Sequence, residues 1–195
     1  MKSRALEMKR ETKETSINLR FDPDVPAQEI STGLPFFDHL LSSMAFHGRM
    51  GLRLSAVGDL EVDPHHLVED TGLVLGAALR QCAQEHGPIA RFGHAVVPMD
   101  EALGEAVVDA GGRSYLVHRA DYPQEYCGRF PVALLQEFFY ALAQKGGITL
   151  HLWARYGSNS HHMAEALFKS LGRALRQAYR PSGSTEPIST KGFLD

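Results

Sequence analysis

The sequence is poor in the features that mark secreted or membrane proteins. It has two cysteines, Cys82 and Cys127, in 195 residues, and they form neither a CxxC motif nor a disulfide framework. No apolar run reaches the length that spans a bilayer. The first residues are charged and lack the apolar segment of a secretory signal. We therefore expect a cytoplasmic protein with no membrane partner.

The chain also lacks a large excess of charge of one sign. Its formal net charge is −3, which gives no reason to expect a nucleic-acid partner over the whole surface. Hydrophobic residues make up 44% and charged residues 22% of the chain, as in ordinary folded domains. This length and composition allow one sizeable core or two small packed halves.

Histidine is abundant, with ten in the chain, and four of them form two adjacent pairs, in "HHLVED" (65–70) and "HHMAEA" (161–166). In each motif a glutamate follows the first histidine by four residues. If each motif opens a helix, His65 and Glu69 share one face and could chelate a cation, as could His161 and Glu165. The second histidine of each pair points about 100° around the helix, so each pair could serve two metal ions. Imidazole with carboxylate suits Mn, Fe, Co, Ni or Zn; the alternative is an exposed helix start with favourably placed acidic residues.

The two histidine motifs belong to an internal duplication. Residues 36–54 align with residues 134–152 at an offset of 98, and after a loop of different length the offset becomes 96. "HHLVED" then aligns with "HHMAEA", and "LGAALRQ" (75–81) aligns with "LGRALRQ" (171–177). Chance is a poor explanation for matches in this order.

The hydrophobic pattern of each half predicts a helix, a strand, a loop and a second helix. Apolar residues recur at helical spacing in 66–82 and 134–143, whereas "MGLRLSAV" and "ITLHLWARY" alternate like half-buried strands. "TSINLRF" in the first half, and "HAVVPMD", "EAVVDAG" and "SYLVHRA" in the second, are further strand-like runs. We expect an α+β fold in which each half is a sheet with two helices on one face, and the helices pack between the two sheets. The halves, about 1–88 and 89–180, would form one catalytic domain over 1–195, with an aperiodic tail at 181–195.

Four segments together resemble imidazoleglycerol-phosphate dehydratase, an enzyme of histidine biosynthesis: "FFDHLLSSMAFHG", "DPHHLVEDTG", "NSHHMAEALFKSLGRALRQA" and "STKG". The resemblance covers essentially the whole chain, with the motifs in the family's order. It implies a duplicated, ribosomal protein S5 domain 2-like fold and a hydro-lyase activity. It also implies two Mn²⁺ ions per active site and a homo-oligomer of twenty-four subunits whose active sites are shared between subunits.

The resemblance further implies a set of metal ligands: His39, His65, His66, Glu69, Glu137, His161, His162 and Glu165. Glu137 departs from the family, because many relatives have histidine at this position. The duplication nevertheless aligns Glu137 with His39, and manganese accepts carboxylate oxygen readily. The alternative is that Glu137 is a solvated helix residue.

For the substrate, the resemblance implies contacts with Glu14, His39, His47, Arg91, Arg113, Lys169, Ser189, Thr190 and Lys191. The basic members would hold the phosphate, for which the arginine fork is well shaped. Glu14, His47 and Asp100 are the candidate catalytic residues. We expect Glu14 to be the main proton carrier and to act first as a base, because a carboxylate near two cations stays ionised.

The reaction that the resemblance implies is loss of water from imidazole glycerol phosphate, which gives imidazole acetol phosphate. One metal ion on each ring nitrogen would stabilise an imidazolate and orient the ring. Two other classes remain open from the histidine motifs alone: a protein that stores metal, and a binuclear metallohydrolase. Storage does not explain the phosphate-binding residues, and hydrolysis does not explain the resemblance over the whole chain.

Overall fold

The computed structural model describes residues 4–85 and 88–183 of the chain. The first half contains β1 (Leu6–Glu11), β2 (Thr15–Asp22), β3 (Ala27–Ser31), α1 (Pro35–Gly48), β4 (Gly51–Gly58) and α2 (His65–Glu85). The second contains β5 (Phe92–Met99), β6 (Ala102–Asp109), β7 (Tyr115–Arg119), α3 (Leu134–Gly146), β10 (Thr149–Tyr156) and α4 (Ser160–Ala178). A short hairpin of β8 (Tyr126–Cys127) and β9 (Phe130–Pro131) lies between β7 and α3.

The two halves have the same topology. Their four-stranded sheets run in the orders β1-β2-β4-β3 and β5-β6-β10-β7. The third strand of each half, β3 or β7, pairs in parallel with β4 or β10, and the other neighbours pair antiparallel. The prediction of an α+β fold with duplicated halves is therefore confirmed.

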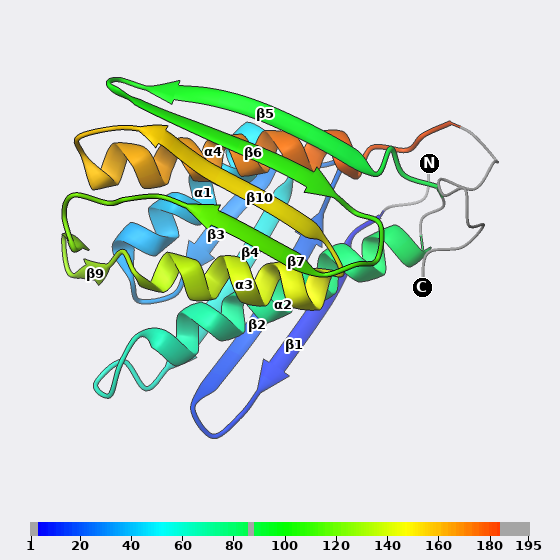
Figure 1. Cartoon of the computed structure of the whole chain (residues 1–195). Coiled ribbons are helices and arrows are strands. Elements are labelled where there is room, and N and C mark those ends of the chain that lie inside the picture. The colour runs from blue at the N-terminus through cyan, green and yellow to red at the C-terminus, as the bar shows by residue number, and fades with distance from the viewer. Residues whose placement is uncertain (1–3, 86–87, 184–195) are drawn as a thin grey trace.

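The helices lie between the two sheets, as expected from their apolar faces (Figure 1). Helix α2 packs on β1 and β2, and α4 packs on β5 and β6. Across the middle, α1 contacts α4 and α2 contacts α3, so each helix also pairs with a helix of the other half. The ring of Phe138 lies 5.3 Å from that of Phe37 and 5.5 Å from that of Phe168, so α1, α3 and α4 meet in one aromatic core.

Gly76 and Gly172, which are equivalent in the duplication, explain how closely α2 crosses α3 and α4 crosses α1. A Cβ on Gly76 of α2 would lie 2.7 Å from the carbonyl oxygen of Leu142 in α3. Its counterpart, Gly172 of α4, lies against the carbonyl of Met44 in α1, and Met44 is the counterpart of Leu142. Any side chain at either glycine would push the paired helices apart.

The sequence pattern missed two strands of the first half. The pattern predicts one strand, β2, ahead of α1, whereas the structure has three. In β1, "LEMKRE", only Leu6 is buried, and β3, "AQEIS", has no buried residue. Edge strands of this kind form through their backbone pairing with β2 and β4 and carry little hydrophobic alternation. None of the described helices is both long enough and apolar enough to cross a membrane.

Candidate active site

The two histidine pairs open helices that are capped alike. The backbone N–H of His65 donates to Asp63 Oδ1 at 2.6 Å, and that of His161 donates to Asn159 Oδ1 at 2.9 Å. Side-chain oxygens that accept from the first turn stabilise a helix start. The predicted helix starts are therefore present in both halves, with α2 beginning at His65 and α4 at Ser160.

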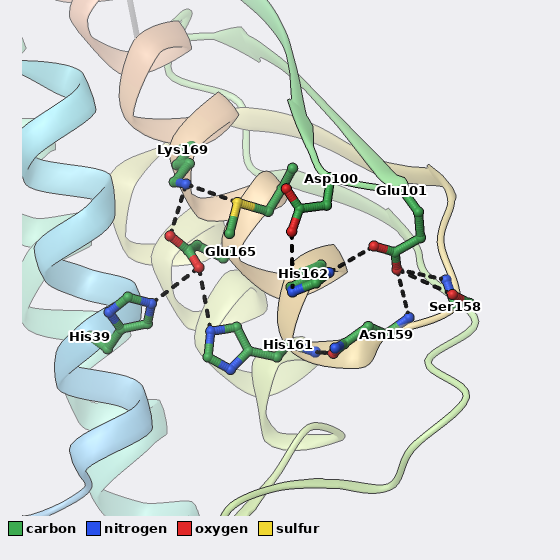
Figure 2. Close-up of polar contacts among 10 residues, drawn as sticks. His39, Asp100, Glu101, Ser158, Asn159, His161, His162, Glu165 and Lys169 are labelled. Atoms are coloured by element: carbon green, nitrogen blue, oxygen red, sulfur yellow. Dashed lines mark hydrogen bonds and ion pairs between the residues drawn. The ribbon is translucent and has the colours of Figure 1, made fainter.

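Three predicted ligands from different halves come together between α1 and α4. His39 Nε2 and His161 Nε2 lie 3.2 and 3.3 Å from Glu165 Oε2. Their potential ligand atoms all lie within 4.8 Å of one another, and no other group of three or more such residues occurs within 4–85 and 88–183. Figure 2 shows both imidazoles directed at the Glu165 carboxylate. Two imidazole nitrogens and a carboxylate oxygen are a donor set that fits a divalent ion such as Mn²⁺.

The Glu165 carboxylate is buried but charged. Its side chain is 8% exposed, and its Oε1 atom lies 2.8 Å from Lys169 Nζ and accepts a 3.4 Å hydrogen bond from Ser43. Burial alone raises the pKa of Glu165, but the bonds from Lys169 and His39 outweigh burial and lower the pKa to about 2. The cluster therefore holds a fixed negative charge suited to a cation.

The corresponding residues of the first half are more open. His65 Nε2 lies 3.6 Å from Glu69 Oε2, and these side chains are 41% and 40% exposed. Glu137 lies on α3, which packs against α2. It does not join His65 and Glu69 in a ligand group within the described part of the chain.

The second histidine of each pair is held by a carboxylate through Nδ1. Asp59 Oδ2 lies 3.1 Å from His66 Nδ1, and Glu101 Oε2 lies 2.7 Å from His162 Nδ1 (Figure 2). These bonds are the main reason that the pKa of each histidine is raised. Sequence reasoning missed Asp59 and Glu101, because the two do not occupy equivalent positions of the duplication and so carry no repeat signal.

Two of the three candidate proton carriers, Glu14 and Asp100, lie on the surface near these histidines. Glu14 is exposed in the turn between β1 and β2, and its carbonyl accepts from the backbone N–H of Asp59 at 3.1 Å. The Glu14 charge also helps to raise the pKa of His66. Asp100, in the turn between β5 and β6, is exposed, and its Oδ2 lies 3.8 Å from His162 Nε2. On α1, burial first, and then the charges of Lys169 and Arg173, lower the pKa of His47.

The predicted phosphate ligands are spread over the molecule. Lys169 lies at the Glu165 cluster, whereas Arg91 is engaged with Asp109 at 2.6 and 3.0 Å. The backbone N–H of Arg91 donates to the carbonyl of Ala178 at the end of α4, about 25 Å along that helix from His161. Arg113 is exposed. Ser189, Thr190 and Lys191 lie outside the described residues.

A cavity of about 1030 Å³ opens beside the cluster and has His39 and His161 in its wall. Its other lining residues include Leu34, Phe36 and Phe130, with one charged side chain, Arg129. The ring of Phe36 lies 4.9 Å from that of His161. The cavity therefore gives a small molecule access to the two imidazoles.

The comparison with protein families agrees with this geometry. The model of the family described as imidazoleglycerol-phosphate dehydratase matches residues 32–175, which include α1, α2, α3 and both histidine motifs. The chain belongs to the imidazoleglycerol-phosphate dehydratase family. Members of this family are hydro-lyases, and they dehydrate imidazoleglycerol phosphate in histidine biosynthesis.

Individual imidazoleglycerol-phosphate dehydratases match along nearly their whole length. The one from an Anaeromyxobacter species is 50% identical over 189 residues, covering 95% of this chain and 89% of that relative. The one from an Exiguobacterium species is 46% identical over 193 residues, covering 98% and 99%. The solved dehydratases of Staphylococcus aureus and Pyrococcus furiosus both superpose with a TM-score of 0.83, at 34% and 39% identity. They cover 91% and 96% of this chain, and this chain covers 99% and 100% of them. The predicted family and enzyme class are confirmed.

Proposed function

We propose that the chain converts imidazole glycerol phosphate to imidazole acetol phosphate at a site with two Mn²⁺ ions, and that a second copy of the chain completes this site. The observation that carries the proposal is the cluster of His39, His161 and Glu165, which presents two imidazole nitrogens and a charged carboxylate beside an open cavity. The cytoplasmic location remains a prediction.

The ligand chemistry supports two metal positions. His39 Nε2, His161 Nε2 and Glu165 Oε2 would hold one ion. His65 and Glu69 would hold the other, and His66, His162 and Glu137 would supply the remaining ligands. Bound at these positions, Mn²⁺ would act as a Lewis acid towards the imidazole ring of the substrate and as a template for its orientation.

Distances within one chain support a shared site. The substrate has its phosphate a few bonds from its ring, yet Arg91 lies about 25 Å from His161 along α4. His65 and Glu69 are half exposed and have no third ligand from their own chain among the described residues. A symmetric oligomer, which we propose to have twenty-four subunits, would place the His65–Glu69 pair of one copy against the His39, His161 and Glu165 cluster of another.

The residues of the chain would divide the remaining tasks. Arg91, Arg113 and Lys169, with Ser189, Thr190 and Lys191, would hold the phosphate. Glu14 would take the proton from the substrate, because its carboxylate is exposed near His66 and has no polar side-chain contact among the described residues. A neutral His47, favoured by its lowered pKa, could accept a proton in a later step, and Asp100 could act beside His162.

Turnover of imidazole glycerol phosphate by the metal-stripped chain tests this function. The ketone product is followed by the ultraviolet absorbance of its enol in alkali. We expect no turnover without metal and full recovery with Mn²⁺. Binding of Mn²⁺ without turnover would indicate storage, release of inorganic phosphate would indicate a hydrolase, and full activity of a metal-free chain would exclude the proposal.

A further inference from the structure

We propose that Glu101 is a positioning residue for the metal ligand His162, and that Asp59 has the same role for His66. The inference rests on the proposed function, since it takes both histidines to be manganese ligands. Glu101 Oε2 lies 2.7 Å from His162 Nδ1, and both carboxylate oxygens of Asp59 lie within 3.2 Å of His66 Nδ1. The same ring nitrogen is held in both halves.

The choice of nitrogen decides which atom is left for a metal. A neutral imidazole carries one N–H, and an ionised carboxylate can only accept a hydrogen bond. A carboxylate at Nδ1 therefore keeps the proton on Nδ1 and leaves the lone pair of Nε2 free to bind a cation. In Figure 2 the Nε2 atom of His162 faces away from Glu101, on the side of the exposed Asp100. His39 and His161 also direct Nε2 towards their cluster.

The Glu101 carboxylate is itself fixed. Its Oε1 atom accepts from the backbone N–H groups of Ser158 and Asn159 at 3.0 and 2.9 Å. Asn159 is the N-cap of α4. Glu101 therefore ties the turn between β5 and β6 to the start of the helix that carries His162, and only Oε2 remains for the histidine.

The residue of the first half that is equivalent to Glu101 is Glu14, and Glu14 does not bond the second histidine of that half. Glu101 directly precedes β6, and Glu14 directly precedes β2 in the same place of the fold. In the first half, Asp59, directly after β4, bonds the histidine instead, and the position directly after β10 is Gly157, which has no side chain. Asp59 thus leaves the Glu14 carboxylate available for proton transfer, whereas Glu101 is fully engaged.

Glu101→Gln and Asp59→Asn should affect the histidine tautomer differently, because, within the part of the chain that the structure describes, the Glu101 carboxylate has other hydrogen-bond partners and the Asp59 carboxylate does not. In Glu101→Gln the amide oxygen stays with the Ser158 and Asn159 N–H groups, so the NH₂ group faces His162 Nδ1 and donates to it. The ring proton must then move to Nε2, where it blocks the metal. Asp59 has no other side-chain partner among the described residues, so Asp59→Asn can turn its oxygen towards His66 and preserve the tautomer. Substitutions such as Glu101→Gln, which change the hydrogen-bond partner of a metal ligand, weaken metal binding by about 10- to 100-fold.

The test titrates the metal-free chains with Mn²⁺ and follows the electron paramagnetic resonance signal of the free ion. We expect Glu101→Gln to weaken Mn²⁺ binding at one site by about 10- to 100-fold, and Asp59→Asn to bind nearly as the wild type does. The matched control is Glu105→Gln. It removes a carboxylate of the same hairpin that contacts Arg155 and His94, which are not proposed ligands. Its Mn²⁺ binding should not change.

Solid-state ¹⁵N NMR of the metal-free wild type, at a pH above the raised pKa of His162 so that the ring is neutral, shows which ring nitrogen carries the proton. The His162 signals are assigned by their loss in His162→Ala, and we expect the proton on Nδ1 in the wild type and on Nε2 in Glu101→Gln. A wild-type proton on Nε2, or normal Mn²⁺ binding by Glu101→Gln when His162→Ala has lost an ion, would overturn the inference alone. Normal Mn²⁺ binding by His162→Ala would overturn the ligand set of the proposed function itself.

Discussion

Glu165 and Glu69 occupy equivalent positions of the duplication but have different surroundings. Glu165 is 8% exposed and is contacted by His39, Lys169 and Ser43. Glu69 is 40% exposed and pairs with His65 at 3.6 Å. Around Glu69, the positions that correspond to the three Glu165 partners are Glu137 and Ala141 of α3 and Leu73 of α2. The backbone repeats, whereas the charges that would complete a second cluster in the same chain do not.

Under the proposed function, this difference means that one chain would contain most of one metal site and only part of the other. The α1–α4 contact supplies ligands from both halves, while the α2–α3 contact places a carboxylate, a leucine and an alanine where the other site has a histidine, a lysine and a serine. An exposed His–Glu pair without a third ligand is what an interface between copies would complete.

The largest effects should come from removing a metal ligand in each half. His161→Ala breaks the buried cluster and His65→Ala breaks the exposed pair. We expect each chain to lose about one of two Mn²⁺ ions, because each substitution removes one of the two chelating pairs. Activity should fall by more than about 10⁴-fold, beyond the effect of an acid–base residue. Elemental analysis and turnover measure both. If His65→Ala kept full metal and activity, the exposed pair would not be a metal site.

Glu14→Gln should give the next largest effect and a different phenotype. It removes a base but no ligand, so we expect kcat to fall by about 10²- to 10⁴-fold while Mn²⁺ content stays at the wild-type level. Glu11→Gln is the matched control, because Glu11 lies in the same hairpin and pairs with Lys9. Its activity should not change. A Glu14→Gln chain with wild-type kcat would move the catalytic role to His47 or Asp100.

Lys169→Met tests the charge balance of the buried cluster. It leaves the Glu165 carboxylate without its nearest cation, so the metal-free chain should lose about 3 kcal/mol of unfolding free energy. Added Mn²⁺ should restore part of this stability, because the ion replaces the missing positive charge. Denaturant unfolding with and without Mn²⁺ measures the difference. Equal stability of Lys169→Met and the wild type without metal would mean that Lys169 does not stabilise Glu165.

Leu73→Lys is the reciprocal change in the first half and should have the smallest effect. It gives Glu69 a lysine four residues later, as Glu165 has. Because Glu69 is half exposed, the new pair should add only about 0.3–0.5 kcal/mol, measured by the same unfolding experiment. A gain as large as the loss in Lys169→Met would show that the two surroundings are more alike than their exposure indicates.

The fold could be predicted well from the sequence, because the duplication repeats the pattern of apolar residues that form the core. Helices α2 and α3 and the strands β4 and β10 followed from periodicity, and α4 followed from its alignment with α2 in the duplication. The edge strands β1 and β3 did not, because backbone pairing rather than side-chain burial defines them. The glycines at 76 and 172 were visible as a repeat, but the close helix crossing that needs them is a tertiary property.

For the candidate site, the sequence predicted which residues are chemically suitable but not how they group. The repeat made His39 and Glu137 equivalent, and only the packing of α1 on α4 places His39 on Glu165. Asp59 and Glu101 escaped notice because lone acidic residues in loops are common, and their importance comes from contact with His66 and His162. The predicted substrate contacts of Ser189, Thr190 and Lys191 remain predictions, because these three residues lie outside the part of the chain that the structure describes.

Complementation between two inactive chains tests the shared site most directly. His161→Ala keeps the His65–Glu69 pair, and His65→Ala keeps the cluster of His39, His161 and Glu165. Co-expressed chains can therefore form mixed oligomers. If each site combines the cluster of one copy with the pair of another, random mixing should give intact sites at roughly a quarter of all positions, and activity should recover to about that fraction of the wild type. If each chain holds a whole site, no mixed oligomer contains an intact one. Mixed oligomers that form but remain inactive would contradict the account.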